Sequence, residues 1–287
     1  MKGAKFIDVA GIRTRYFEAG QGEPLVLVHG GQFGSNANAE DWGDTIEAFA
    51  KDFHVFAIDK PGQGHTDNPK NDADYVIGAT VKHLYQFLKA LGIKKANLAG
   101  HSRGGYTVCR LALEHPEAVK SIVIVDSATM MWEVTWYVGV EESAPPFRNL
   151  REQVRYFEAA NSFAGNHVTE DWLDGKLEIE ALPSHKEAVQ KMSRLDGKYI
   201  RDQAAKVEET HRWIKEGRLK CPVLVTWAYE DPSAQYDPVG LAAFRLILPN
   251  VPNAQVHVFN KAGHYVYRER PTQFVAVVKS FIQDLPK

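Results

Sequence analysis

The sequence has little cysteine, little net charge and no long apolar run. Two of its 287 residues are cysteines, Cys109 and Cys221, which excludes a disulfide framework and leaves a hydrophobic core to stabilise the fold. A formal net charge of -2 provides no long-range attraction to nucleic acid or to an anionic membrane. No segment reaches the roughly 20 apolar residues that span a bilayer, and the first residues lack the apolar stretch of a signal peptide. We therefore expect a soluble cytoplasmic protein.

Short apolar runs rich in β-branched residues alternate with helical periodicity along much of the chain. Such runs are typical of strands buried in a parallel sheet, and the helices between them supply the crossovers. Apolar residues recur at helical spacing from Val81 to Leu91, and Gly92 ends that helix. The expected strands are 12–18, 25–28, 54–58, 96–99, 122–125, 223–227 and 255–259, and further helices are expected at 106–115, 238–248 and 272–285.

The alternation stops between residues 127 and 220. This stretch is rich in aromatic residues, contains Pro145-Pro146 and shows no convincing strand pattern. Because strands resume at residue 223, we interpret it as a helical cap inserted into one α/β core domain, formed by 1–126 and 221–287. We expect most of its aromatic side chains to form the core of the cap, and some to line a pocket beneath it.

A Gly-x-Ser-x-Gly pattern runs from Gly100 to Gly104, between a strand pattern and a helix pattern. In a strand–turn–helix context, this pattern lifts the serine out of the chain as a nucleophile. The two glycines leave room where a side chain would collide, so Ser102 can take a strained backbone angle. The context therefore predicts that Ser102 is a catalytic serine and not merely part of a glycine-rich turn.

A serine hydroxyl is a weak nucleophile, and it needs a base that is itself oriented by a carboxylate. His264 is the candidate base, because it lies between the last expected strand and the last expected helix and completes the order Ser…Asp…His. For the acid we favour Asp231, which follows strand 223–227. Asp126 is the alternative acid, since it ends strand 122–125 and some hydrolases take their acid from that place.

The reaction also needs N–H donors aimed at the developing oxyanion. The backbone N–H of Arg103 is one candidate, because it follows the nucleophile at the start of a helix, where N–H groups are free. Gly31 is the other, in the glycine-rich loop that begins at His29. No pair of histidines has metal-ligand spacing, so we expect neither a metal nor a cofactor.

Several motifs together resemble the α/β-hydrolase superfamily over essentially the full chain. They are His29-Gly30-Gly31, the segment from Asp59 to Gly64, the run from Gly100 to Gly105, Asp231, and Gly263-His264, and they follow the order and spacing of the superfamily. The resemblance implies an α/β-hydrolase fold: a mostly parallel eight-stranded sheet flanked by helices, with an inserted helical cap. It also implies cofactor-free hydrolysis through the triad Ser102, His264 and Asp231.

Within the superfamily, the sequence is most similar to meta-cleavage-product hydrolases, which cleave a carbon–carbon bond in 2-hydroxy-6-oxo-dienoates. It departs from them in three places, one of which is the loop 32–42, longer here than in the compact family version. Tyr265 follows the expected catalytic histidine where many have tryptophan, and His101 precedes Ser102 where several have asparagine. A carboxylesterase or lactonase with the same triad is the alternative, and a non-catalytic ligand-binding protein of this fold is a remote one.

The residues expected to contact a small, fairly apolar substrate come from the glycine-rich loop, the cap and the neighbourhood of the expected base: Gln32, Phe33, Trp132, Trp136, Arg194 and Tyr265. The resemblance implies that an arginine holds a substrate carboxylate, and the candidates are Arg194, Arg201 and the side chain of Arg103. By analogy alone, relatives point to a homodimer. Neither nucleic acid nor a membrane is expected as a partner.

Overall fold

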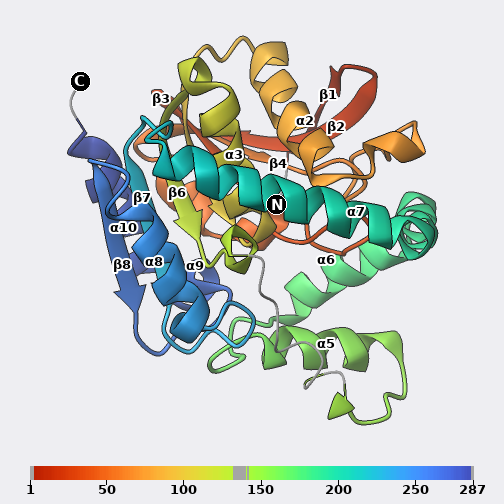
Figure 1. Ribbon diagram of the computed structural model, residues 1–287. Helices are drawn as coiled ribbons and strands as arrows, with labels where there is room; N and C mark the ends of the chain where they lie inside the picture. The colour runs from red at the N-terminus through yellow and green to blue at the C-terminus, as the bar shows by residue number, and fades with distance from the viewer. Residues whose placement is uncertain (1–2, 132–139, 141, 286–287) are drawn as a thin grey trace.

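The sheet is the centre of the fold in our computed structural model, which describes residues 3–131, 140 and 142–285 (Figure 1). Its eight strands lie in the order β1-β2-β4-β3-β5-β6-β7-β8. Strand β2 runs antiparallel to both of its neighbours, and all other neighbouring strands are parallel. The strands are β1 (Lys5–Val9), β2 (Ile12–Ala19), β3 (Glu23–Val28), β4 (Phe53–Ile58), β5 (Ala96–His101), β6 (Val119–Val125), β7 (Val223–Ala228) and β8 (Ala254–Phe259). The predicted mostly parallel, eight-stranded sheet is confirmed.

Helices cover both faces of this sheet (Figure 1). The α-helices are α1 (Thr45–Phe49), α2 (Ile77–Ala90), α3 (Arg103–Glu114), α5 (Leu150–Ala160), α6 (Glu170–Ala181), α7 (Pro183–Lys215), α8 (Leu241–Ile247), α9 (Val266–Glu269) and α10 (Pro271–Gln283). Short helical turns are η1 (Ala39–Trp42), η2 (Asp72–Asp74), η3 (Pro116–Ala118), η4 (Ala128–Met130) and η5 (Tyr236–Gly240). Between β6 and β7, the described residues form helices and loops only, as the sequence indicates for the cap.

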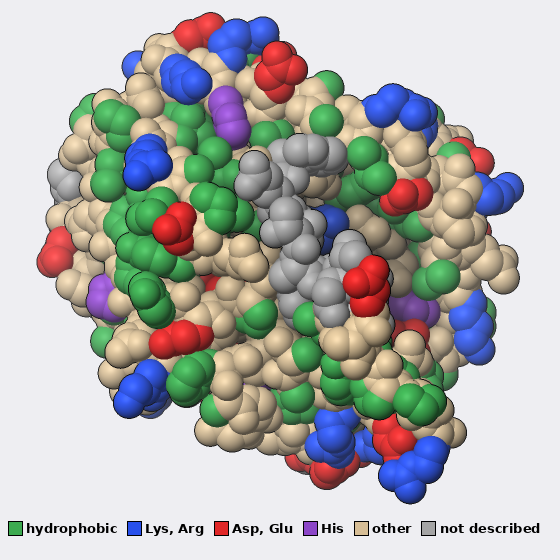
Figure 2. Space-filling view, turned by 60° about the horizontal axis from the view of Figure 1, so that its bottom comes forward, with side chains coloured by type: hydrophobic (Ala, Val, Ile, Leu, Met, Phe, Trp, Pro, Cys, Tyr) green, Lys and Arg blue, Asp and Glu red, His purple; other side chains and the backbone are tan. Residues whose placement is uncertain are grey.

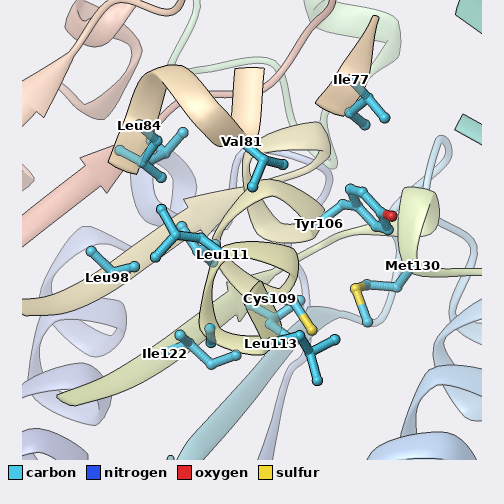
Figure 3. Close-up of a cluster of buried hydrophobic side chains, with 14 of the residues drawn as sticks. Ile77, Val81, Leu84, Leu98, Tyr106, Cys109, Leu111, Leu113, Ile122 and Met130 are labelled. Carbon is cyan, nitrogen blue, oxygen red and sulfur yellow. The ribbon is translucent and has the colours of Figure 1, made fainter. Parts of the chain in front are cut away.

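Alternating side chains of the central strands enter two separate cores. Val26 and Val28 of β3 point toward α2, α3 and α8, whereas Leu25 and Leu27 point toward α1 and α10. Part of the first core is shown in Figure 3, in which side chains from two helices meet two central strands: Ile77, Val81 and Leu84 of α2, Tyr106 and Leu111 of α3, Leu98 of β5 and Ile122 of β6. Burial on both faces holds the carboxyl ends of β3, β5, β6 and β7 in a fixed register, and the loops that follow them carry the candidate site.

Strand β1 is the one strand that no apolar run indicates. It lies at the edge of the sheet, and only Val9 of its five residues is buried, so its sequence has no need to be continuously apolar. Among the described residues, no helix is long and apolar enough to cross a membrane.

Candidate active site

Ser102 occupies a sharp turn between β5 and α3, as the Gly-x-Ser-x-Gly pattern predicts. Its backbone angles are φ 52° and ψ -120°, a strained conformation for a residue with a side chain. A Cβ atom at Gly104 would lie 2.3 Å from the carbonyl oxygen of Val28, and one at Gly100 would lie 2.2 Å from the carbonyl oxygen of Gly104. The two glycines are therefore required for β5, the turn and α3 to pack this closely.

The turn is also held from the neighbouring strand. The Ser102 N–H donates to the carbonyl oxygen of Val125 at 2.8 Å, and the Ser127 hydroxyl donates to the carbonyl oxygen of Ser102 at 2.6 Å. These bonds fix the backbone of Ser102 without using its own hydroxyl. Such fixing from outside the turn is what allows a strained angle to persist.

His264 is bonded to Asp231. The Nδ1–H of His264 donates to Oδ2 of Asp231 at 2.7 Å, and both side chains are buried. The other carboxylate oxygen of Asp231 accepts the backbone N–H groups of Ser233 and Ala234, each at 2.7 Å. With the proton on Nδ1, Nε2 of His264 carries the free lone pair that a general base needs.

Asp126 makes neither a hydrogen bond nor an ion pair with His264. Its Oδ1 accepts the backbone N–H of Ala228 at 2.6 Å, while its Oδ2 is buried without a hydrogen-bond partner among the described residues. Complete burial, together with the nearby charge of Asp231, raises the pKa of Asp126 well above its ordinary value. The structure thus joins the favoured acid, and not the alternative one, to the candidate base.

The glycine-rich loop lies against the candidate nucleophile. A Cβ atom at Gly30 would be 3.1 Å from Cβ of Ser102, and Gly31 has φ +72°, which favours glycine. Lys60 Nζ donates to the carbonyl oxygen of Gly31 at 2.7 Å, and Gln63 Nε2 donates to that of Gly30 at 3.3 Å. With these carbonyls turned toward Lys60 and Gln63, the loop is fixed beside Ser102.

His101, directly before Ser102, contacts the candidate base. Its Nε2–H donates to the carbonyl oxygen of His264 at 2.8 Å, and the hydroxyl of Tyr267 lies 3.3 Å from its Nδ1. Burial, and to a smaller degree the neighbouring His264, lower the pKa of His101 well below its ordinary value. A neutral imidazole therefore connects the end of β5 to the loop of His264.

The same loop is tied to the cap. The N–H of His264 donates to the carbonyl oxygen of Asn161 at 3.0 Å, just after α5. The carboxylate of Glu269 accepts the N–H of Gly263 at 2.8 Å and the N–H of Phe163 at 2.9 Å, one from each side of this contact. The backbone of the candidate base is therefore held jointly by the core and by the end of α5.

One cavity of about 220 Å³ brings these groups together. Its wall includes Ser102, His264, Gly31, Arg103 and Tyr265 of the predicted site. Figure 2 shows that the face turned forward from the bottom of Figure 1 is hollowed, with a basic side chain inside the hollow. Within the described part of the chain, no cluster of three or more His, Cys, Asp or Glu side chains could hold a metal ion.

Several of the predicted substrate contacts lie elsewhere. Phe33 is buried against Tyr75 and Tyr199, at ring-centroid distances of 5.0 and 6.1 Å. Arg194 is exposed on α7, and neither it nor Gln32 lines the cavity. The sequence of a loop or helix does not reveal which way each side chain turns, and contact of these three residues with a substrate stays a prediction. Trp132 and Trp136 lie outside the described residues.

Some cavity residues were not predicted. Asp41, Glu158, Asn161 and Lys176 all line the cavity, three of them from the cap. A signal for Lys176 exists in the sequence: it shares a helical face with Trp172, Leu173 and Ile179, and those three are buried. A lysine within an apolar helical face indicates a buried charge, and that pattern could have identified it.

Comparison with known proteins agrees with this geometry. A family model described as the alpha/beta hydrolase fold matches residues 23–271. The chain belongs to the α/β-hydrolase family. This α/β hydrolase is 27% identical over 282 residues to the 2-hydroxy-6-oxo-6-(2'-aminophenyl)hexa-2,4-dienoic acid hydrolase of Metapseudomonas resinovorans, covering 97% of this chain and 90% of the relative.

Two further comparisons point the same way. The α/β hydrolase is 29% identical over 279 residues to the 2-hydroxymuconate semialdehyde hydrolase of Pseudomonas sp. (strain CF600), covering 97% of this chain and 93% of the relative. A solved structure of the meta-cleavage product hydrolase CumD, from Pseudomonas fluorescens IP01, superposes with a TM-score of 0.80 at 26% identity, covering 98% and 97% of the two chains. The expected similarity to meta-cleavage product hydrolases is confirmed.

Proposed function

We propose that this α/β hydrolase is a serine hydrolase whose triad is Ser102, His264 and Asp231. The observation that carries the proposal is the 2.7 Å bond from Asp231 to a His264 that shares one cavity wall with Ser102, which stands on a strained turn. Geometry of this kind, and not the fold alone, is what supports an activity.

In the proposed mechanism, Ser102 Oγ attacks a substrate carbonyl while Nε2 of His264 takes the serine proton. The backbone N–H groups of Arg103 and Gly31 hold the oxyanion that forms. The tetrahedral intermediate then expels the leaving group, which receives the proton from His264, and an acyl group stays on Ser102. Water, deprotonated by His264, hydrolyses this ester and restores the enzyme.

For the bond that is broken, the names of the relatives favour a carbon–carbon bond next to a ketone, in a 2-hydroxy-6-oxo-dienoate type of substrate. In that reaction the histidine–serine pair would first assist conversion of the dienol to its keto form. Only from the keto form can the carbon leaving group depart as a stabilised carbanion. The aromatic-rich cap suits a small and fairly apolar molecule.

Hydrolysis of an ester or a lactone is the second candidate, and one observation favours it. The cavity cation Lys176 lies 2.7 Å from the carboxylate of Asp41, so its charge is already matched before any substrate carboxylate arrives. A dienoate substrate carries a carboxylate that needs a cation to bind it, whereas a neutral ester or lactone has no carboxylate.

Both candidates are tested by assaying purified protein on a 2-hydroxy-6-oxo-6-phenyl-dienoate and on aryl esters and lactones, with fluorophosphonate labelling in parallel. We expect labelling that disappears in Ser102→Ala and persists in Ser193→Ala, a matched change at an exposed serine of α7. Loss of the dienolate colour, with a specificity constant well above that of any ester, would support carbon–carbon cleavage. An inert dienoate with ester turnover would refute it, and absence of labelling would refute the serine hydrolase itself.

A further inference from the structure

Three charged side chains meet in the cavity wall, and we call them the Lys176 cluster: Lys176, Asp41 and Glu158. Nζ of Lys176 lies 2.7 Å from Oδ1 of Asp41 and 3.6 Å from Oε1 of Glu158. The side chain of Lys176 is only 1% exposed and that of Asp41 only 2%, so water screens this charge poorly. The cluster combines one cation with two carboxylates, and it therefore has no positive charge to spare.

The hydrogen bonds of the cluster are unevenly satisfied. Asp41 is fully engaged, because its Oδ1 also accepts the indole N–H of Trp172 at 3.0 Å and its Oδ2 accepts the backbone N–H of Asn38 at 3.1 Å. By contrast, the ammonium of Lys176 has three N–H donors, and among the described residues it lies at ion-pair distance only from Asp41, at 2.7 Å, and Glu158, at 3.6 Å. A buried ammonium with one close acceptor keeps donors for a further acceptor in the cavity.

Glu158 presents the matching acceptor. Its Oε2 accepts the hydroxyl of Tyr265 at 2.6 Å, which holds the carboxylate in place beside the residue that follows His264. Its Oε1 lies 3.6 Å from Lys176, too far for a hydrogen bond, and the residue lines the cavity. A donor and an acceptor thus stand side by side in the wall, within a cluster whose carboxylates outnumber its cations.

We propose that the Lys176 cluster binds a neutral substrate group that both accepts and donates a hydrogen bond, such as a hydroxyl or a carboxamide, and disfavours a carboxylate. The proposal rests on the proposed function, since it concerns the substrate on which Ser102 acts. The oxygen of that substrate group accepts a hydrogen bond from Lys176, and the N–H or O–H of the same group donates to Oε1 of Glu158. A carboxylate could satisfy Lys176 but would place a third negative charge in a buried site and leave Glu158 unpaired.

Arg103 is the other cation in the described cavity wall, and it lies outside the cluster. Its side chain bonds to Tyr199 of α7, whereas the cluster is formed by α5, α6 and η1. An anion drawn to Arg103 would therefore respond to changes at Arg103 and not to changes in the charge of Glu158. Variants of the cluster carboxylates separate the two effects.

The test uses benzoate and benzamide, which have nearly the same shape and differ in charge. Their dissociation constants are measured by calorimetry on the Ser102→Ala protein, and on the same protein carrying a second change. We expect benzamide to bind more tightly than benzoate. Glu158→Gln should shift the ratio toward benzoate by about tenfold or more, which corresponds to about 1.4 kcal/mol. Asp41→Asn should shift it in the same direction, which keeps the test valid if one variant fails to fold.

Glu152→Gln is the matched control, because Glu152 lies on the same helix but pairs with exposed Arg148. It should leave the ratio unchanged. Tighter binding of benzoate than of benzamide, an unchanged ratio in Glu158→Gln and Asp41→Asn, or no binding of either compound would overturn the proposal. Fluorophosphonate labelling of Ser102 is scored separately on the unsubstituted protein, so failure of the serine hydrolase and failure of the charge selectivity remain distinguishable.

Discussion

Replacing Asp231 and Asp126 one at a time should separate the acid that orients His264 from its buried neighbour. In Asp231→Asn, the side-chain oxygen can still accept the N–H groups of Ser233 and Ala234, so the turn should survive. The new amide, however, would present a donor to Nδ1 of His264. That imidazole would then carry its proton on Nε2 and could not accept one from Ser102.

A wrong tautomer of this kind costs about 10⁴-fold in kcat in a serine-protease triad, or about 5 kcal/mol of transition-state stabilisation. We expect a loss of that order in Asp231→Asn. In Asp126→Asn, Oδ1 can keep the 2.6 Å bond from Ala228, and the raised pKa of Asp126 favours the uncharged form of the native side chain. An uncharged amide of the same shape should therefore leave kcat within about threefold.

The assay is kcat on whichever substrate the unsubstituted protein turns over, with thermal melting to show that both variants are folded. Near-full activity in Asp231→Asn, combined with loss of activity in Asp126→Asn, would refute this assignment and make Asp126 the triad acid. Equal losses would show that the two carboxyl groups act as one unit.

Three further predictions concern stability. Gly104→Ala should lower the free energy of unfolding by about 3 kcal/mol or more, because its Cβ would lie 2.3 Å from a backbone oxygen. The control is Gly175→Ala, whose Cβ would have no neighbour within 4 Å; in thermal melts it should be neutral or stabilising by up to about 1 kcal/mol. Lys176→Met should lower the free energy of unfolding by about 3–5 kcal/mol, because it leaves the buried carboxylate of Asp41 without its cation. Adding Asp41→Asn should restore part of that loss when unfolding is followed in urea. Additive effects of the two changes would contradict the ion pair. Burial lowers the pKa of His83 to about 4, so between about pH 6.5 and pH 4 the unfolded chain binds a proton that the folded chain does not. The free energy of unfolding should therefore fall by about 3 kcal/mol as the pH drops through that window. His83→Gln should reduce that fall when unfolding is compared at pH 7 and pH 4.5, and an unchanged slope would show that His83 is not responsible.

The parts of the site that follow from local chain geometry could be predicted from the sequence. The turn at Ser102 needs glycine on both sides because strand, turn and helix nearly touch, and that requirement is visible as Gly100 and Gly104. The position of His264 follows from the order of strands and helices. The fold was predictable for the same reason, since buried parallel strands have continuous apolar runs.

The parts that depend on contacts between distant segments could not be predicted. The sequence favours Asp231 as the acid, but Asp126 also follows a strand, and the choice between them rests on the bond to His264. The pairing of Lys176 with Asp41 joins a cap helix to a loop of the core, and no spacing in the sequence encodes it. The edge strand β1 was missed because its side chains are mostly exposed.

The bonds that join the loop of His264 to the end of α5 bear on how this enzyme could be re-engineered. Asn161 and Phe163 belong to the inserted cap by position in the sequence, yet they hold the catalytic histidine of the proposed triad. A chimera made by exchanging the whole insertion would replace that support together with the pocket. A graft that begins after residue 163 and ends before β7 would exchange α6 and α7 and keep the native bonds of Asn161 and Phe163 that support the loop of His264. These two points are therefore the natural boundaries for transplanting a new specificity.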